Sequence, residues 1–201
     1  MQSLLKPKHL HMHSALFNLL SQFNKFSSDE LQLIEAQLVV RKVKENEFLL
    51  ERGAVCREIL FITEGLVRTL IHNNDGEEQT HYFIKENQFI ADLESFNNLT
   101  PATESIQAVC DSTLIVLSKK SIDLLIASIP QWKETMLQIA QKALMEKIYT
   151  RNAYLGVDAT ARYLKFITEQ GDIALCAPQS IIASYLGITP QSLSRIRKQV
   201  R

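Results

Sequence analysis

The 201-residue sequence is poor in the residues that build covalently braced, fibrous or membrane-spanning proteins. Its three cysteines, Cys56, Cys110 and Cys176, stand far apart, so neither a disulfide framework nor a thiolate metal cluster is indicated. Six glycines and five prolines exclude a collagen-like or low-complexity chain. Apolar runs such as 59–62 are much too short to cross a bilayer. We therefore expect reduced thiols, no membrane association, no metal or other cofactor, and a cytoplasmic location.

Charge of neither sign is in excess, because 22 Lys and Arg residues balance 22 Asp and Glu residues. The hydrophobic content of 46% in a chain of this length supports two unequal domains, each with its own core. From Gln179 onward, however, there are four basic residues and no acidic one. Such local cationic patches drive nucleic-acid binding, although a basic tail taken alone equally fits a solvated surface.

Near the N-terminus, His9, His11 and His13 alternate and would point to one side of an extended strand. Without a neighbouring carboxylate or cysteine they make a poor metal site, and we expect residues 1–13 to be a short polar terminus. Two short helices should follow within 15–38, the second capped near Ser27 and Ser28.

From Val39 to about Ser118 the sequence changes to short segments rich in Val, Ile, Phe and Leu. The Asp75-Gly76 pair between 66–71 and 79–84 predicts a β-hairpin, because glycine tolerates the positive φ of its turn. Many short strands of this kind indicate a barrel or roll.

Helical patterns return at 119–128 and again after Pro130, where the second pattern reaches roughly Asn152. The longer helix has more apolar surface than one side of a surface helix needs. One stripe could pack on the β region while a second meets its twin in a homodimer; burial between two domains of one chain is the alternative. The predicted dimer helix carries Met136, Leu137, Ala140, Leu144 and Ile148.

A further helix is predicted from Asp158 to Gln170, ended by Gly171, and it opens a small C-terminal helical domain. Beyond it, the stretch from Gln179 to Lys198 reads as two helices joined by a tight turn. A small residue at the crossing, a glycine in the turn and five apolar positions facing inward are the requirements of a helix-turn-helix. The residues that meet them are Ile182, Ala183, Leu186, Gly187, Ile188, Leu193 and Ile196.

The second of these helices has its own start signal, with Thr189 as N-cap and Pro190 at the first helical position. Its outward face would then carry side chains that reach base edges in the major groove, where arginine can fork onto guanine and glutamine onto adenine. We predict base contacts from Gln191, Ser192 and Arg195. We predict phosphate contacts, which set register, from Ser180, Thr189, Arg197 and Lys198. An ordinary helical hairpin with a hydrated face is the competing interpretation.

The whole layout resembles the Crp/Fnr family of transcription regulators. The resemblance rests on LLERGAVCREILFITEGLVR (49–68) and, more specifically, on IASYLGITPQSLSRIRK (182–198). It implies an α+β fold in which an N-terminal cyclic-nucleotide-binding-like β-roll, a double-stranded jelly-roll, is joined by a long dimerisation helix to a C-terminal winged helix-turn-helix. The corresponding division is a sensor domain with N-terminal helices at 1–128, a dimerisation helix at 129–153 and a DNA-binding domain at 154–201. The resemblance also places Gln191 and Arg195 at base-contacting positions.

One departure from the family concerns its phosphate-binding cassette, in which a Gly-Glu pair precedes an arginine by about ten residues in members that bind cyclic AMP. The equivalent stretch here, 89–109, contains no glycine, arginine or lysine. A cyclic phosphate needs a cationic or amide-rich cradle. We therefore expect a degenerate cassette that does not bind cyclic AMP or cyclic GMP tightly, its residues including Asp92, Glu94, Thr103 and Glu104. The cysteine cluster of oxygen-sensing relatives is missing too, which argues against a haem or iron–sulfur sensor.

The sequence thus predicts a homodimeric regulator that binds double-stranded DNA at a two-fold related operator, with RNA polymerase and an unknown small effector as candidate partners. The alternative is a sensing module for a cyclic-nucleotide-like small molecule, whose helical tail docks a protein. An enzyme is disfavoured, since no catalytic constellation stands out.

Overall fold

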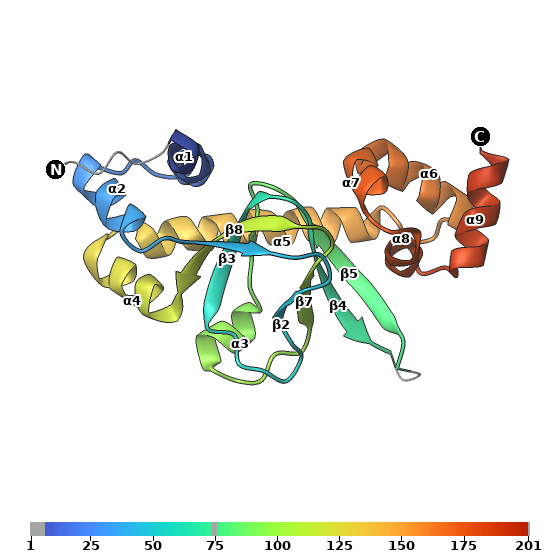
Figure 1. Cartoon of the computed structure of the whole chain (residues 1–201), viewed down its shortest axis with the longest axis horizontal. Coiled ribbons are helices and arrows are strands. Elements are labelled where there is room, and N and C mark those ends of the chain that lie inside the picture. Colours follow the sequence, from blue (N-terminus) through green and yellow to red (C-terminus); the bar gives the residue numbers. More distant parts are fainter. Residues whose placement is uncertain (1–6, 74–75, 201) are drawn as a thin grey trace.

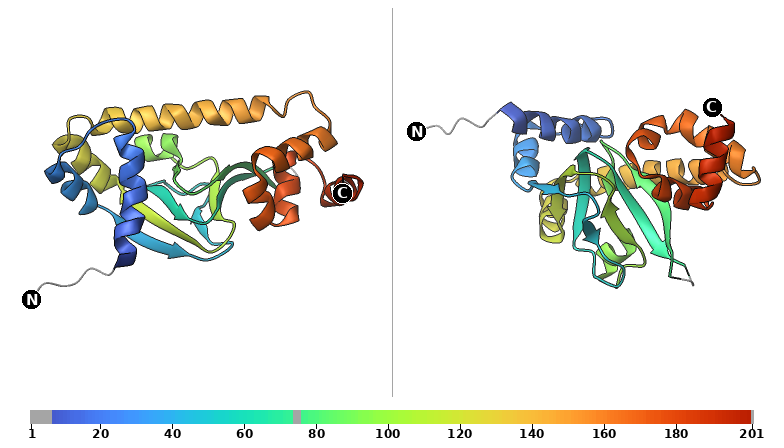
Figure 2. Two further views of the ribbon diagram at one scale, coloured as in Figure 1. Left: turned by 90° about the horizontal axis from the view of Figure 1, so that it is seen from above. Right: turned by 45° about the vertical axis from the view of Figure 1, so that its right-hand side comes forward.

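The computed structural model describes residues 7–73 and 76–200, with the backbone alone described for 7–12. A β-roll occupies the middle of the molecule, and a long helix, α5, runs beside it from the N-terminal helices to a group of C-terminal helices (Figure 1). Seen from above, α5 lies along one side of the roll over much of the molecule's length (Figure 2). None of the described helices is long and apolar enough to cross a membrane.

Two helices, α1 (Pro7–Ser21) and α2 (Ser28–Glu35), open the described chain. Ser27 and Glu30 form a reciprocal capping box that fixes the start of α2. The expected polar terminus at 1–13 is wrong for residues 7–13, which belong to α1. The side chains of His9 and His11, two of the three histidines considered as metal ligands, lie outside the described residues. For the third, Nδ1 of His13 lies 2.9 Å from Oε1 of Glu35. A carboxylate is therefore near His13 after all, but the described residues hold no group of three potential metal ligands.

The roll consists of two four-stranded antiparallel sheets, one ordered β1-β8-β3-β6 and the other β2-β7-β4-β5. Its inner surface is lined by aliphatic and aromatic side chains, among them Phe61, Ile62, Val67 and Leu114, which are almost fully buried. The strands are β1 (Val39–Val43), β2 (Phe48–Leu50), β3 (Glu58–Glu64), β4 (Val67–His72), β5 (Glu78–Ile84), β6 (Phe89–Ile90), β7 (Ser105–Ala108) and β8 (Ser112–Ser118).

The predicted hairpin is confirmed as β4 and β5, which pair from Val67 opposite Ile84 to His72 opposite Glu78. At its turn Gly76 has φ +79°, the left-handed conformation for which glycine has no steric cost. Of the predicted Asp75-Gly76 pair, Asp75 lies outside the described residues. The hairpin places β5 at the edge of its sheet, where it meets the C-terminal helices.

Three helices connect or follow the strands: α3 (Leu93–Asn98), α4 (Lys119–Ser128) and α5 (Trp132–Asn152). The bounds of α4 and the end of α5 are as predicted. The first turns of α5 are anchored in the roll's core by Trp132, Thr135 and Ile139, which are buried. Asn24 Nδ2 donates to Thr135 Oγ1 at 2.8 Å, which ties α5 to the loop after α1.

Four helices complete the described chain: α6 (Ala159–Glu169), α7 (Gly171–Cys176), α8 (Gln179–Leu186) and α9 (Pro190–Gln199). Asp158 caps α6 by accepting from the amide of Ala161. The prediction that Gly171 simply ends that helix is wrong, because it begins the short helix α7. No strand occurs within 119–200, so these residues do not form the wing that the family resemblance implies.

Candidate nucleic-acid interface

The turn between α8 and α9 depends on one backbone conformation. Gly187 has φ +66°, and the amide of Ile188 then bonds the carbonyl of Ala183 at 3.0 Å. A Cβ built on Gly187 would meet only a guanidinium nitrogen of Arg162 at 3.6 Å, an ordinary contact. The positive φ, rather than lack of space, therefore explains the glycine.

The second helix starts as predicted. The side chain of Thr189 accepts a hydrogen bond from the amide of Ser192 at 3.2 Å, and Pro190 occupies the first turn, where a missing amide hydrogen costs nothing. The Thr189 hydroxyl also bonds the Ser192 hydroxyl at 3.0 Å. Because Ser192 is half-buried and engaged in the cap, it is less available for a base contact than its neighbours on the outer face.

The apolar interior of the helix-turn-helix contains the residues that the spacing selects. Five are buried, Ala183 and Leu193 completely, and Ile188 packs partly buried against them. Gly187 itself is exposed. The buried set is Ile182, Ala183, Leu186, Leu193 and Ile196.

The outer face of α9 is polar and open to solvent. Gln191, Arg195 and Lys198 are exposed along one line of the helix, while Arg197 is half-buried. Ser180 and Thr189 are exposed at the starts of α8 and α9. Within the described residues no carboxylate pairs with any of the basic residues of α9. In Figure 1, α9 lies at the end of the molecule farthest from the N-terminal helices, where a rod-shaped ligand could approach it.

In the predicted degenerate cassette of the roll, Asp92 forms hydrogen bonds within the chain. Asp92 caps α3 by accepting from the amide of Ser95 at 3.0 Å, and its second oxygen accepts from the amide of Thr103 at 3.1 Å. The Asp92 carboxylate therefore accepts hydrogen bonds from two backbone amides, those of Ser95 and Thr103. Glu94 and Thr103 have exposed side chains.

The carboxylate of Glu104, just before β7, interacts with a residue of β5 and a residue of α5. His81 Nδ1 of β5 lies 2.8 Å from Glu104 Oε1, and this hydrogen bond lowers the pKa of the Glu104 carboxyl. Lys147 of α5 stands near the same carboxylate and 4.8 Å from the ring centre of Tyr82. Burial lowers the pKa of Lys147, and the attraction of Glu104 opposes that effect. The carboxylate thus interacts with His81 of the roll and with Lys147 of the long helix.

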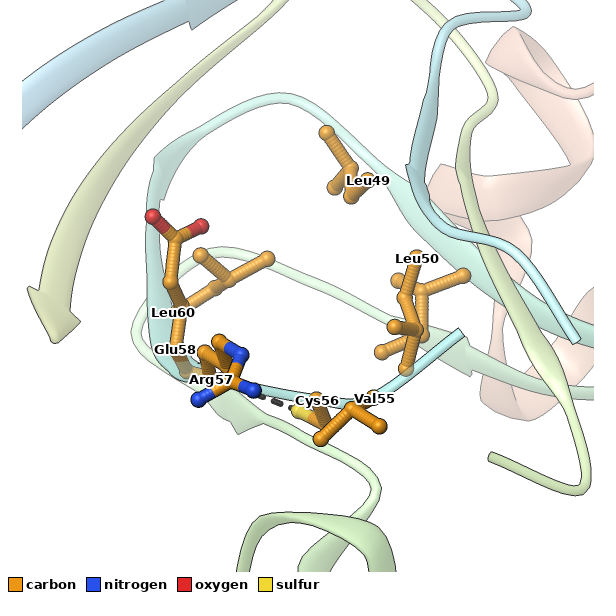
Figure 3. A pocket seen from close by; sticks show the side chains of 8 residues that line it. Leu49, Leu50, Val55, Cys56, Arg57, Glu58 and Leu60 are labelled. Atoms are coloured by element: carbon orange, nitrogen blue, oxygen red, sulfur yellow. Dashed lines mark hydrogen bonds between the residues drawn. The ribbon is translucent and has the colours of Figure 1, made fainter. Parts of the chain in front are cut away.

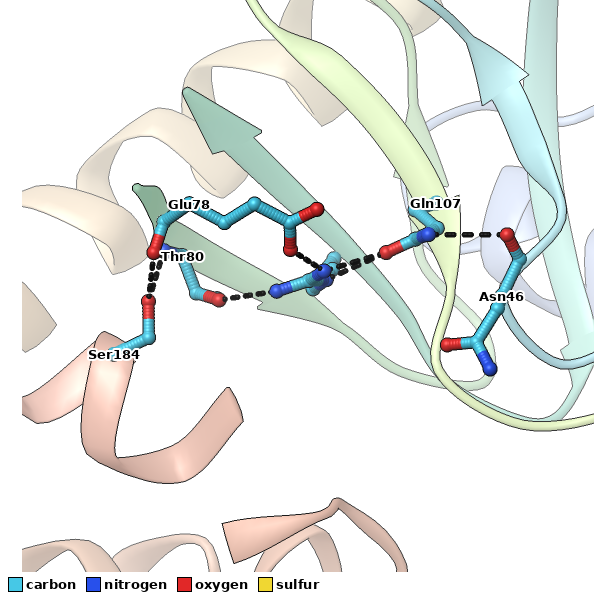
Figure 4. A network of polar contacts seen from close by, with 6 residues as sticks. Asn46, Glu78, Thr80, Gln107 and Ser184 are labelled. Atoms are coloured by element: carbon cyan, nitrogen blue, oxygen red, sulfur yellow. Dashed lines mark hydrogen bonds and ion pairs between the residues drawn. The ribbon is translucent and has the colours of Figure 1, made fainter. Parts of the chain in front are cut away.

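A buried arginine that the sequence interpretation missed lies on β4. Arg68 donates to Gln107 Oε1 from Nε at 2.9 Å, to Thr80 Oγ1 at 3.0 Å, and to the Glu78 carboxylate (Figure 4). Gln107 in turn donates to the carbonyl of Asn46 at 3.0 Å. Its position on a strand of the predicted hairpin was a signal for the partners on β5, but Gln107 lies on β7, 39 residues away. The network ties β4 to both of its neighbours.

The C-terminal helices are docked on this side of the roll. Ser184 Oγ of α8 accepts from the amide of Thr80 and donates to the carbonyl of Glu78, both at 2.8 Å (Figure 4). Beside it, the Phe83 ring lies 4.9 Å from that of Tyr185, centre to centre. Lys85 Nζ also meets Asp172 of α7 at 2.7 Å. Sequence spacing gave no signal for these contacts.

A cavity of about 160 Å³ lies among aliphatic side chains of the roll, with Leu50 and Leu60 on opposite sides (Figure 3). The amide of Cys56, at its border, donates to Ser95 Oγ of α3 at 2.8 Å, which places the cavity beside the cassette. Burial raises the pKa of the Cys56 thiol and keeps it protonated. The charged groups at its rim, Arg57 and Glu58, include a carboxylate already paired with Arg41.

Some apolar residues of α5 pack against the roll, and others face solvent. Met136 packs half-buried against the roll's core, next to Ile139. Leu137 and Leu144 are 66% and 57% exposed, and Ile148 is 43% exposed. The half-buried Ala140 lies between them. The predicted dimer stripe is therefore exposed in a single chain at Leu137, Leu144 and Ile148, and half-buried at Met136 and Ala140.

Together these features define a β-roll protein with an N-terminal helical pair, a long connecting helix and a C-terminal helix-turn-helix. Residues 40–128 match the cyclic nucleotide-binding domain family. No curated protein matches the chain.

Solved structures share this architecture over most of their length. A Crp/Fnr-family transcriptional regulator from Eubacterium rectale covers 90% of this chain, and 87% of its own chain, with a TM-score of 0.71 and 17% identity. FixK2 from Bradyrhizobium japonicum covers 81% and 84%, with a TM-score of 0.69 and 16% identity. The c-di-GMP-responsive global regulator CLP of Xanthomonas campestris covers 87% and 91%, with a TM-score of 0.70 and 12% identity. The fold is that of Crp/Fnr regulators, as the sequence resemblance predicts.

Proposed function

We propose that the chain is a sequence-specific DNA-binding transcription regulator of the Crp/Fnr type, without catalytic activity. The observation that carries this proposal is the exposed, unpaired polar line Gln191, Arg195 and Lys198 on a helix whose other side is locked into the core. A helix of this kind fits the major groove, whose edges present distinct donors and acceptors.

The two kinds of DNA contact are assigned by position on the motif. Gln191 and Arg195 read bases, with Ser192 a weaker contributor because its hydroxyl belongs to the cap. Ser180, Thr189, Arg197 and Lys198 contact phosphates and fix the register of the helix on the duplex.

The regulator acts as a homodimer through α5. The stripe of Leu137, Ala140, Leu144 and Ile148 is apolar, and its three large side chains are exposed, which has a cost in water. Pairing of this stripe with its copy places two recognition helices about one helical turn apart, roughly 34 Å, on a two-fold related operator. In this proposal residues 1–128 form the sensor domain, 129–153 the dimerisation helix and 154–201 the DNA-binding domain.

The roll does not bind cyclic AMP tightly. Asp92 already holds the amides of Ser95 and Thr103, and Glu104 already engages His81 and Lys147, so these donors are taken by carboxylates before a phosphate arrives. The function of the roll is then to hold α5 and to carry the C-terminal helices. As parts of the proposed regulator function we also propose a cytoplasmic location and contact with RNA polymerase.

One experiment distinguishes this regulator from the alternative, a small-molecule sensing module whose helical tail docks a protein. Duplexes are selected from a random pool by the full chain, and their affinity is measured by fluorescence anisotropy at several salt concentrations. We expect a two-fold related consensus, and we expect Arg195→Ala to lose about 1 to 3 kcal/mol on it while relaxing one base pair. Failure to enrich any sequence, together with binding that salt does not weaken, would refute the regulator.

A further inference from the structure

A second cavity, of about 200 Å³, lies where the roll, the end of α5 and the C-terminal helices meet. Its walls include Tyr82 of β5, Tyr154 after α5 and Tyr185 of α8. Arg151 and Arg162 also line it. The cavity thus lies between the edge strand of the roll, the end of α5 and helices α6 and α8.

Arg162 makes this cavity chemically specific. Its Nε is buried, yet among the described residues no acceptor pairs with it, and no carboxylate pairs with its guanidinium. Leaving a buried donor unsatisfied is costly, so a site with this feature is suited to an acceptor from outside. Arg151, which is exposed and likewise without a carboxylate partner in the described chain, adds a second positive charge.

The tyrosines define the rest of the ligand. The rings of Tyr154 and Tyr185 meet edge-on, with centres 5.9 Å apart. Gln170 Nε2 donates to both of their oxygens, at 3.2 and 3.3 Å, so at least one phenolic proton remains to donate to a ligand. Burial raises the pKa of both hydroxyls, and the nearby Glu169 acts in the same direction, so they stay neutral.

We propose that this cavity binds a small aromatic carboxylate, held by Arg162 and stacked among the three tyrosines. A guanidinium matches a carboxylate in a two-point fork, and aromatic walls favour an aromatic ring. A cavity of roughly 150 Å³ is enough to hold benzene, so the volume here fits one ring with its carboxylate. The guanidinium of Arg162 stands beside Gly187, so the ligand would brace the turn of the helix-turn-helix against the roll.

The role of this cavity as an effector site rests on the proposed function, but the test of ligand binding does not involve DNA. Benzoate is titrated into the full-length chain by calorimetry, alongside cyclohexanecarboxylate and inorganic phosphate. We expect one benzoate per chain, bound at least tenfold more tightly than either of the other two. Arg162→Gln should weaken benzoate binding at least tenfold. Lys133→Gln, which removes an exposed cation at the start of α5 and outside the cavity, should leave benzoate binding unchanged.

Tyr82→Leu supplies a second variant, on the roll side of the cavity, should Arg162→Gln prove unfolded by circular dichroism. It should also weaken benzoate at least severalfold. Absence of saturable benzoate binding, equal affinity for cyclohexanecarboxylate or phosphate, or unchanged affinity in either folded variant would overturn the proposal. None of these results would bear on whether the chain binds DNA.

Discussion

The hydroxyl of Ser184 and the amide of Thr80 are joined by a 2.8 Å hydrogen bond although the two residues are 104 positions apart. The same hydroxyl donates to Glu78, so one small side chain links the edge of the roll to the first helix of the helix-turn-helix. Position 184 is therefore a structural junction between the roll and the C-terminal helices. This junction can be tested without knowing the DNA site.

Ser184→Ala should loosen the docking of the C-terminal helices on β5. Both hydrogen bonds disappear and the buried Thr80 amide loses its acceptor, at a cost of about 1 to 3 kcal/mol. Hydrogen exchange followed by mass spectrometry should then show faster exchange in the β5 segment. Ser180→Ala, an exposed serine of the same helix, should leave that exchange unchanged; equal protection in both variants would mean that the link carries little energy.

Leu144→Glu should convert a dimer to a monomer. The leucine is 57% exposed in the single chain, so a glutamate costs the monomer little, but it places two charges in the proposed interface. Sedimentation at micromolar concentration measures the change. Leu175→Glu, at a residue 90% exposed on α7, is the matched control and should remain dimeric. A wild-type chain that sediments as a monomer would remove the basis of the dimer.

Glu104→Gln should abolish one acid-sensitive contribution to stability. The pKa of Glu104 is lowered in the folded chain, so its stabilisation is complete above the ordinary value of 4.5 and is lost as the pH falls through the folded value. The variant should be about 1 kcal/mol less stable near neutral pH, and the difference should vanish in acid.

Urea unfolding followed by the fluorescence of Trp132, the single tryptophan, reports on this change because its ring is fully buried beside the roll. Glu94→Gln is the control, since Glu94 is exposed on α3. A constant difference between wild type and Glu104→Gln at every pH would show that the carboxylate's charge is not involved.

Lys198→Ala should weaken binding to all duplexes alike. A lysine at a phosphate neutralises one backbone charge, so its loss reduces the slope of log affinity against log salt by roughly one. Anisotropy titrations on the selected duplex and on a scrambled one measure both effects. A change confined to the selected duplex would reassign Lys198 to base reading.

Local signals in the sequence were sufficient where neighbours along the chain determine the structure. Thr189, Pro190 and Gly187 act within one turn, and each has the predicted role in the structure. The bounds of α4 and the β4–β5 hairpin were predictable for the same reason. The helix at 7–13 was missed because its polar residues resemble a frayed end, and Gly171 was misread because glycine also begins helices.

Contacts between distant segments could not be predicted. The predicted hairpin accounts for the partners of Arg68 on β5, but Gln107 lies 39 residues away on β7. Arg162 lines a cavity whose other walls come from β5, α5 and α8. Spacing along the chain brings neither Gln107 to Arg68 nor Arg162 to β5, because these contacts depend on the pairing of β4 with β7 and on the docking of α8. The exposed line on α9 was predictable, whereas the surface that supports it was not.

The most direct test of the account asks whether α9 reads the major groove. Guanine N7 in the selected duplex is methylated sparsely, and bound and free DNA are separated for the full-length wild type and for Arg195→Ala. We predict that methylation of at least one guanine in each half-site blocks wild-type binding, because the Arg195 fork requires that nitrogen, and that the same methylation no longer affects the variant. Wild-type binding that tolerates N7 methylation throughout the site would contradict the placement of α9 in the groove.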